Sequence, residues 1–253
     1  MPEIAARPGR IATHWLTVAA LAAATLWMTF DIAGYERLLR LLAPGNDTVT
    51  YPTKSLPMLM GEQLFLVATA SSIALVIGAL LGALALSRAG RPFRDLIVSV
   101  GNLAQTIPSV AIMALAIPAT GYGAEPVVIA LVLYSILPIM LNVITGIEGV
   151  APDAIDAATG VGMTAPQRLA WVQVPLAMPV IMGGVKNMLV INVSAATMGA
   201  VVAAGGLGQP ILAGFHDYNN AFIIQGALPA IALALFVDRL LSAPKTSKAA
   251  TRR

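Results

Sequence analysis

Six stretches of this chain contain no aspartate, glutamate, lysine or arginine, and each is at least 20 residues long. They cover residues 11–30, 63–87, 96–124, 126–147, 187–216 and 218–237. A helix needs about 20 consecutive apolar residues to cross a hydrocarbon core of about 30 Å. Only 11% of the 253 residues are charged, whereas soluble domains carry about a quarter. The sequence therefore predicts an all-α polytopic membrane protein with about six transmembrane helices.

The same composition excludes several other classes of protein. A soluble enzyme would need more charge at its surface, and a disordered chain would have fewer apolar residues than the 58% found here. The absence of cysteine excludes a secreted module that is held together by disulfides.

The membrane-crossing helices are expected at roughly 13–31, 63–87, 96–118, 126–146, 174–202 and 221–241. The first could instead be a signal peptide, because Arg7 and Arg10 precede its apolar stretch. No small-residue cleavage pattern follows, which favours a retained helix. Pro108 is expected to kink the third helix, since proline removes a backbone hydrogen bond. Gly78 and Gly82 form a small-residue face that is suited to packing against another helix.

The distribution of lysine and arginine predicts the orientation, because short cytoplasmic loops are enriched in these residues. A cytoplasmic N-terminus would place three of them outside, at Arg37, Arg40 and Lys54, and would leave Lys186 within a span. The eleven others would lie inside: Arg7, Arg10, Arg88, Arg91, Arg94, Arg168, Arg239, Lys245, Lys248, Arg252 and Arg253. Both termini are therefore expected in the cytoplasm, with the basic tail 242–253 near anionic membrane lipids. Because the basic residues are scattered over short segments, we expect no nucleic acid as a partner.

Residues for catalysis or cofactor binding are missing. No G-x-x-x-x-G-K-[ST] stretch is present, so the chain has no phosphate-binding loop of its own. With no cysteine and only two histidines, His14 and His216, no ordinary transition-metal site can be assembled. We therefore expect no catalytic residue, no metal and no cofactor. Uphill transport would take its energy from a partner or from an ion gradient.

The inner segment between the fourth and fifth spans has the sequence of a compact helical knob. Pro152 and Asp153 suit the start of a helix, because proline is tolerated in the first turn and a carboxylate favours the positive end of the helix dipole. Gly160 and Gly162 then permit a sharp turn, and residues 164–167 have the spacing of a capping box that would start a second short helix. A helical connecting loop without further role would have the same pattern.

The spacing within this knob carries a resemblance to a known family. Asp156-Ala157-Ala158 is followed after three residues by Gly162, and after nine more by Val172-Gln173-Val174-Pro175. This resembles the Glu-Ala-Ala signature of bacterial ATP-binding-cassette importer permeases, with Asp in place of Glu and Val in place of Ile and Leu. The resemblance implies a coupling segment, 150–173, that seats in a cleft of an ATPase subunit. Its coupling residues would be Asp153, Asp156, Ala157, Ala158, Gly160, Gly162 and Pro175, the last marking a bend into the fifth span.

Three further segments are similar to those of glycine betaine and osmoprotectant permeases. They are Gly101–Ser109, Tyr134–Pro138 and Gly205–Ile211. The resemblance implies an importer permease fold of the smaller type that pairs with a second permease copy, identical or different. It also implies a dimer of ATPase subunits that binds the ATP, a periplasmic substrate-binding protein, and a place in the bacterial inner membrane.

The resemblance divides the chain into segments that we treat as one domain with additions. A cytoplasmic N-terminus at 1–12 would precede an extra helix at 13–31 and a periplasmic loop at 32–62. The permease domain would cover 63–241, and a basic cytoplasmic tail would follow at 242–253.

Polar side chains inside the spans are candidates for the translocation path, because polar groups at membrane depth are costly unless they face a bundle interior or a cavity. Asn102, Gln105 and Ser109 are spaced to share one helical face. The full set is Asn102, Gln105, Ser109, Asn142, Asn187, Ser194 and Thr197. Hydrogen bonding between helices is the alternative explanation for each of them. Lys186, the ionised residue deep within a span, is expected to pair with a helix-end carbonyl or an interface residue, or to extend toward the interface.

We expect the membrane subunit of an ATP-driven importer for an osmoprotectant such as glycine betaine, choline or carnitine. Aromatic residues make up only 6% of the chain, so selectivity for a quaternary ammonium is expected in a separate binding protein. Importers of methionine or of sulfonates share the coupling motif and remain alternatives. An ion-coupled secondary carrier and a structural membrane scaffold are the alternatives from other classes.

Overall fold

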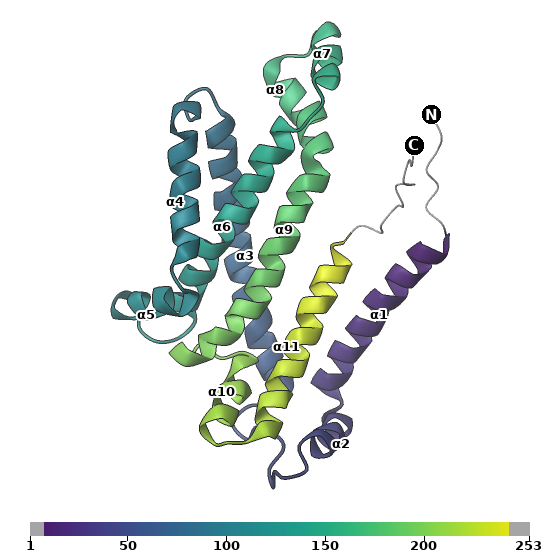
Figure 1. The fold of residues 1–253 in the computed structure, drawn as a ribbon, viewed down its shortest axis with the longest axis vertical. Helices are drawn as coiled ribbons and strands as arrows, with labels where there is room; N and C mark the ends of the chain where they lie inside the picture. The colour runs from purple at the N-terminus through teal and green to yellow at the C-terminus, as the bar shows by residue number, and fades with distance from the viewer. Residues whose placement is uncertain (1–7, 243–253) are drawn as a thin grey trace, which may run out of the picture.

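The computed structural model describes residues 8–242 and is helical throughout its regular parts (Figure 1). Within that range five helical segments are long and apolar enough to cross a membrane. They coincide largely with the helices α1 (Pro8–Phe30), α3 (Leu56–Leu86), α6 (Ala124–Glu148), α9 (Val174–Ala196) and α11 (Asn220–Leu240). The fold class predicted from the charge-free stretches is confirmed. Most of the N-terminal segment expected at 1–12, and all of the expected tail except Ser242, lie outside the described residues.

The expected third span is not one helix. Residues 96–118 fall on α4 (Arg94–Thr106) and α5 (Ser109–Thr120), which are separated at Ile107 and Pro108. Proline has no N–H to donate and disfavours helical backbone in the residue before it, and Ile107 is extended with φ −85° and ψ 125°. The expected kink is therefore a break, and α5 lies across the end of α4 (Figure 1). Neither piece alone is long enough to cross a membrane, since 13 residues of helix extend about 20 Å.

The centre of the bundle consists of α3, α6 and α9 packed side by side. Helices α3 and α6 approach closely because glycine removes side-chain bulk at the contact. A Cβ at Gly78 would lie 2.9 Å from the Ile136 carbonyl oxygen, and one at Gly82 would lie 2.9 Å from Val143 Cβ. The packing face predicted from these two glycines is thus found against α6.

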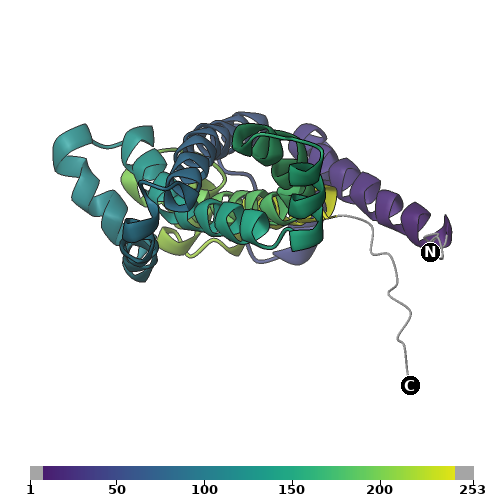
Figure 2. The same ribbon diagram turned by 90° about the horizontal axis from the view of Figure 1, so that it is seen from above.

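The helices that flank this centre extend the bundle to both sides. Helix α1 packs against α11, while α4 and α5 pack against α6 on the other side. Seen from above, α1 lies at one edge of the molecule and the pair α4–α5 at the opposite edge (Figure 2). The segment expected as a loop at 32–62 contains helix α2 (Ile32–Leu42) and the first turns of α3.

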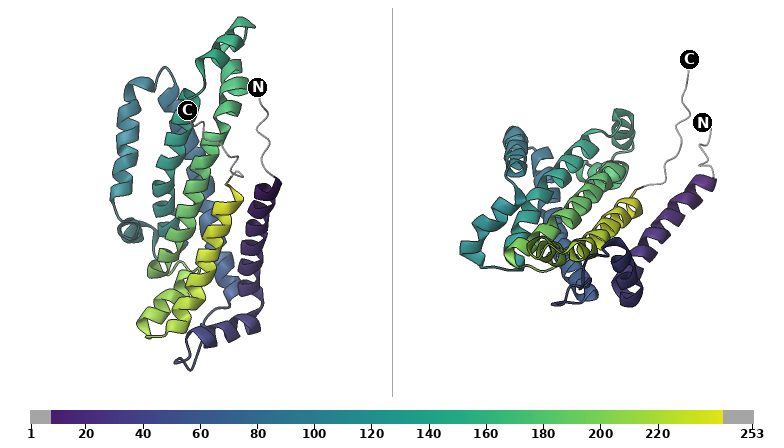
Figure 3. Two further views of the ribbon diagram at one scale, coloured as in Figure 1. Left: turned by 45° about the vertical axis from the view of Figure 1, so that its right-hand side comes forward. Right: turned by 60° about the horizontal axis from the view of Figure 1, so that its bottom comes forward.

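Two groups of short helices lie at opposite ends of the bundle (Figures 1 and 3). One end, called the α7 end, carries α7 (Pro152–Gly160) and α8 (Ala165–Arg168). The other, called the α10 end, carries α2 and α10 (Gly208–His216). Short helical turns at Arg91–Phe93 and Thr197–Val202 complete the connections.

Candidate coupling and translocation sites

The knob predicted between the fourth and fifth spans is formed by α7, a tight turn and α8. Helix α7 begins at Pro152 and has Asp153 in its first turn. It ends in a turn where the N–H of Met163 donates to the Ala158 carbonyl at 3.1 Å. Gly162 lies in this turn with φ +84°, a left-handed conformation that costs a residue with a Cβ about 1–2 kcal/mol. The turn therefore depends on glycine at this position.

Most of the candidate coupling residues are exposed on this knob. Ala158 is buried, whereas Asp153, Asp156, Ala157 and Gly160 face solvent. Open space surrounds the positions where a Cβ would be placed on Gly160 and Gly162. The knob therefore presents a small-residue surface at the α7 end that a partner's backbone can approach closely.

The knob continues into α9 without a break. The capping box predicted from the spacing is present between Thr164 and Gln167, and the backbone N–H of Thr164 donates to Gln167 Oε1 at 2.8 Å. A π-helical turn at Leu169–Gln173 then joins α8 to α9, and the N–H of Val174 donates to the Leu169 carbonyl five residues back. Pro175 lies directly after the π turn, in the first turn of α9, where proline is tolerated because the N–H that it lacks is not needed there.

A cavity of about 600 Å³ lies at the base of the knob, bordered by the ends of α3 and α6, by α7, α8 and by the π turn. Its lining is mostly apolar and includes Arg91 and Glu148. Glu148, at the last residue of α6, accepts an ion-pair contact from Arg94 at 2.7 Å, which ties α4 to α6. Beside this cavity, Ala154 and Ile155 of α7 pack against a cluster formed by Ile147, Val150 and Ala177, so the knob contacts the ends of both α6 and α9.

The first group of candidate path residues does not share one helical face. Asn102 and Gln105 lie on α4, but Ser109 begins α5 beyond the break at Pro108, so the expected common face is wrong. Gln105 is exposed, and its Nε2 donates to the Tyr134 carbonyl of α6 at 3.0 Å. Tyr134 in turn donates its hydroxyl to the carbonyl of Ile107, inside the break.

The remaining candidates are mostly satisfied within their own helices. Asn142 Nδ2 donates to Pro138 O at 2.7 Å, Ser194 Oγ to Val190 O at 3.1 Å, and Thr197 Oγ1 to Ser194 O at 2.7 Å. Asn142 also packs against α9, where a Cβ at Gly184 would lie 2.7 Å from its own Cβ. Asn187 is exposed. Gln105 and Asn142 therefore each contact another long helix, α6 and α9 respectively.

A buried polar cluster that the sequence reasoning missed joins the three central helices. Asn192 on α9 donates to Ser71 Oγ on α3 at 2.8 Å and accepts from Ser135 Oγ on α6 at 2.7 Å. All three side chains are buried. Each one occurs in a charge-free stretch, but the sequence gives no sign that they face one another across 121 and 57 residues.

A second missed arrangement holds the glycine-rich segment at the α10 end. Glu62 Oε2 accepts from the N–H of Gly206 at 2.8 Å, and buried Gln63 accepts from the N–H of Leu207 at 3.2 Å. Gly205 and Gly206 have φ of +90° and +78°. Two adjacent side chains at the start of α3 thus bind the backbone of the segment whose sequence is similar to that of osmoprotectant permeases.

Lys186 has a carboxylate partner. Its Nζ lies 2.8 Å from Asp238 Oδ1 in the last turn of α11 and donates to Ser242 Oγ at 2.8 Å. Lys186 was expected to pair with a residue near the membrane interface. Its partner, Asp238, lies at the end of α11, which agrees with that expectation.

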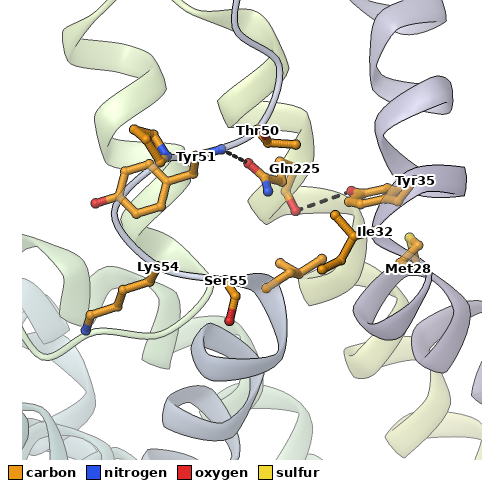
Figure 4. A pocket seen from close by; sticks show the side chains of 10 residues that line it. Met28, Ile32, Tyr35, Thr50, Tyr51, Lys54, Ser55 and Gln225 are labelled. Atoms are coloured by element: carbon orange, nitrogen blue, oxygen red, sulfur yellow. Dashed lines mark hydrogen bonds between the residues drawn. The ribbon is translucent and has the colours of Figure 1, made fainter.

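A cavity of about 340 Å³ lies at the α10 end between α1, α2, the segment 50–55, the start of α3 and α11 (Figure 4). Tyr35 is buried in its wall and donates its hydroxyl to the carbonyls of Ile224 and Gln225 at 3.2 and 3.3 Å. Burial raises the pKa of the Tyr35 phenol above its ordinary value, so the hydroxyl keeps its proton. Gln225 Oε1 accepts from the N–H of Tyr51 at 2.7 Å.

Comparison with known proteins agrees with the predicted family and with the fold. Residues 74–243 match the family described as binding-protein-dependent transport system inner membrane component. The glycine betaine/carnitine/choline transport system permease protein OpuCB of Bacillus subtilis is 36% identical over 182 residues, which cover 72% of this chain and 83% of that protein. The osmoprotectant import permease protein OsmW of Salmonella typhimurium is 37% identical over 203 residues, covering 77% and 94%.

Two solved structures are similar in fold. The MetNI methionine ABC transporter in an inward facing conformation superposes with a TM-score of 0.61 at 24% identity, covering 71% of this chain and 91% of that chain. An amino acid ABC transporter crystallised with histidines has a TM-score of 0.63 at 18% identity, covering 84% and 95%. The resemblance inferred from Asp156–Pro175 is confirmed, and this chain belongs to the binding-protein-dependent inner membrane components, the permease subunits of ATP-binding-cassette importers.

Proposed function

We propose that this importer permease moves an osmoprotectant such as glycine betaine, choline or carnitine inward across the bacterial inner membrane. The similar permeases from Bacillus and Salmonella transport glycine betaine, carnitine and choline or import osmoprotectants, as their names state, and this supports the same class of substrate here. Because the chain has no phosphate-binding loop, ATP is bound and hydrolysed by a partner ATPase dimer, and this subunit is neither catalytic nor dependent on a cofactor.

The observation that carries the proposal is the exposed knob with its glycine turn. A coupling element must reach a partner outside the membrane and transmit its movement to the spans. Helices α7 and α8 protrude from the bundle, and the α8 side continues through the π turn into α9. The proposed coupling residues are Asp153, Asp156, Ala157, Ala158, Gly160, Gly162 and Pro175, within the segment 150–173 of a permease domain that covers 63–241.

The orientation follows from this assignment. If the ATPase contacts the knob, the α7 end is cytoplasmic, which agrees with the eleven lysines and arginines that the sequence places inside. Both chain termini are then cytoplasmic, and the α10 end faces the periplasm and the binding protein. The apolar side chains Leu96, Val100 and Leu103 are exposed on α4 and give a surface for a second permease, identical or related.

The translocation path is proposed to include Asn102, Gln105, Ser109, Asn142, Asn187, Ser194 and Thr197. The exposed positions of Asn102 and Asn187 support access from a neighbouring chain or a shared passage. The hydrogen bonds that several of the others make within their own helices also suit a purely structural role.

The test is uptake of radiolabelled glycine betaine by proteoliposomes that contain the permease, its ATPase and its binding protein. We expect uptake to require ATP and to be lost in Gly162→Trp, because the side chain obstructs both the turn and the contact surface. Gly121→Trp is the matched control. Its φ of +82° carries the same backbone strain, open space surrounds it, and it lies at the other end of the bundle between α5 and α6.

Each part of the proposal has its own contradicting outcome. Normal ATP-dependent uptake by Gly162→Trp would remove the coupling assignment. Uptake that is driven by a sodium or proton gradient without the ATPase would instead indicate a secondary carrier. If the binding protein stimulates the ATPase activity but no betaine is taken up, the assignment of betaine as the substrate is wrong and the assignment as an importer permease stands.

A further inference from the structure

Two prolines interrupt the hydrogen bonds of neighbouring helices at places that lie close together. Pro108 separates α4 from α5, and Pro138 lies inside α6. Proline lacks the N–H that would donate to the carbonyl four residues earlier, and in α6 that carbonyl belongs to Tyr134. At the break, the first N–H of α5, that of Ala111, donates to the Pro108 carbonyl at 2.9 Å, which leaves the Ile107 carbonyl between the two helices. Within a membrane both carbonyls need a donor from elsewhere.

Two side chains supply these donors in opposite directions. Gln105, in the last turn of α4, donates its Nε2 to the Tyr134 carbonyl at 3.0 Å. Tyr134 donates its hydroxyl to the Ile107 carbonyl. We call this pair of hydrogen bonds the α4–α6 clasp. It joins two of the segments that the sequence analysis singled out, Gly101–Ser109 and Tyr134–Pro138, which are separated along the chain by α5.

The clasp bridges the point about which α5 can turn. Helix α5 lies across the end of α4 (Figure 1) and packs against α6. Its inner side carries Ile112 and Met113, both of which are buried. The backbone is extended at Ile107, so α5 can change its angle to α4 without loss of a hydrogen bond inside either helix. The observed position of α5 therefore depends on contacts such as the clasp.

The other end of α5 is linked to the helix that continues from the knob. In the loop after α5, the N–H of Gly123 donates to the Val202 carbonyl at 2.9 Å. Val202 ends the turn Thr197–Val202, which follows α9 directly, and α5 also contacts this turn. Movement of α9 against α4 would therefore pull on one end of α5, while the clasp holds the other.

We propose that Gln105 and Tyr134 are positioning residues for transport, which hold α5 in its observed position until α9 moves. Ile107 and Pro108 form the hinge. Opening of the clasp leaves the Tyr134 carbonyl without a donor, and this cost favours the closed position. The clasp rests on the geometry, whereas its part in transport rests on the proposed coupling through the knob.

The test uses the absence of cysteine from the chain, since one introduced thiol can then report on one place. Met113 is 0% exposed on the inner side of α5, so Met113→Cys should react with a water-soluble maleimide only when α5 opens. The labelling rate then follows the population of the open position. In the complete importer in nanodiscs, we expect Tyr134→Phe to raise this rate about fivefold, the factor that one net hydrogen bond contributes to an equilibrium. With the clasp intact, ATP and the binding protein should also raise it.

Two matched controls separate the clasp from a general loosening of the fold. Tyr122→Phe removes the hydroxyl of an exposed tyrosine in the loop between α5 and α6, and it should leave labelling at position 113 unchanged. Met60→Cys introduces the same thiol at a buried methionine of α3, on the side of α1, and its labelling should not respond to Tyr134→Phe. Equal increases at positions 113 and 60 would overturn the inference.

A second pair of variants tests the reciprocal bonds. Gln105→Leu removes the donor to the Tyr134 carbonyl, and Pro138→Ala supplies that carbonyl with an N–H from within α6. Each should raise labelling at position 113. Together they should raise it no further than the stronger of the two alone, because both act on the same bond. Effects that multiply would contradict the clasp.

The remaining outcomes distinguish this inference from the proposed function. Labelling that Tyr134→Phe leaves unchanged would overturn the clasp, and labelling that ATP leaves unchanged would overturn its part in transport. If ATP-driven betaine uptake is still present in either case, the proposed function stands without the hinge. If labelling responds both to Tyr134→Phe and to ATP but betaine is never taken up, the hinge stands and the proposed substrate is wrong.

Discussion

The ammonium group of Lys186 lies 2.8 Å from a carboxylate oxygen of Asp238, and this contact joins the middle of α9 to the last turn of α11. Both side chains are about a quarter to a third exposed, so solvent screens part of their attraction. The pair therefore positions the two helices more than it stabilises the fold.

The first prediction concerns this ion pair. We expect Lys186→Asp alone to lower the unfolding temperature, because two carboxylates would then face each other across the contact. The double variant Lys186→Asp with Asp238→Lys should recover most of the loss, with a coupling free energy of up to about 1 kcal/mol. Thermal unfolding of the four proteins in detergent measures this cycle. If the loss of stability in the double variant equals the sum of the losses in the two single variants, the two side chains do not interact.

The second prediction concerns the buried polar cluster. Asn192→Leu leaves Ser71 and Ser135 without their partner in the centre of the bundle, and we expect it to destabilise the protein by about 1–2 kcal/mol. Asn187→Leu is the matched control on the same helix, since Asn187 is exposed, and it should change stability by less than about 0.5 kcal/mol. Equal losses in the two variants, measured by denaturant unfolding, would contradict the assignment.

The third prediction concerns the glycine-rich segment at the α10 end. A Cβ at Gly206 would lie 2.6 Å from Gln63 Oε1, and the φ of +78° adds backbone strain. We expect Gly206→Ala to cost about 1–3 kcal/mol. Gly45→Ala serves as the control, because open space surrounds that position and its φ is not positive. A normal unfolding temperature for Gly206→Ala would show that the contact between α3 and this segment is loose.

The fourth prediction concerns pH. The folded state binds the Tyr35 proton more tightly than the unfolded state, because burial raises the pKa of this phenol above its ordinary value near 10. The stabilisation is therefore complete below pH 10 and is lost as the pH rises further, since the unfolded chain ionises first. In Tyr35→Phe the decline of stability above pH 10 should be shallower than in the wild type. Unfolding temperatures measured between pH 8 and 11 test this difference, and parallel curves would contradict it.

Features that depend on nearby residues could be predicted from the sequence. The knob is an example, because the Pro152 helix start, the Gly162 turn and the contact between Thr164 and Gln167 each involve residues a few positions apart. The break at Pro108 is an intermediate case. The local effect of proline was foreseen, but a charge-free stretch of sufficient length does not show whether the helix bends or ends there.

The sequence by itself determined that the chain crosses a membrane, since hydrocarbon excludes charge and the charge-free stretches have the length that a helix needs. Only the tertiary structure decided which polar side chains meet. Tyr35 binds the carbonyl of Gln225 across 190 residues, and Asn192 binds Ser71 across 121. Such pairs depend on which helices are neighbours and on how each is rotated. The neighbours and the rotation of each helix are set by packing along its whole surface. A single polar residue in an apolar stretch contributes little to that packing.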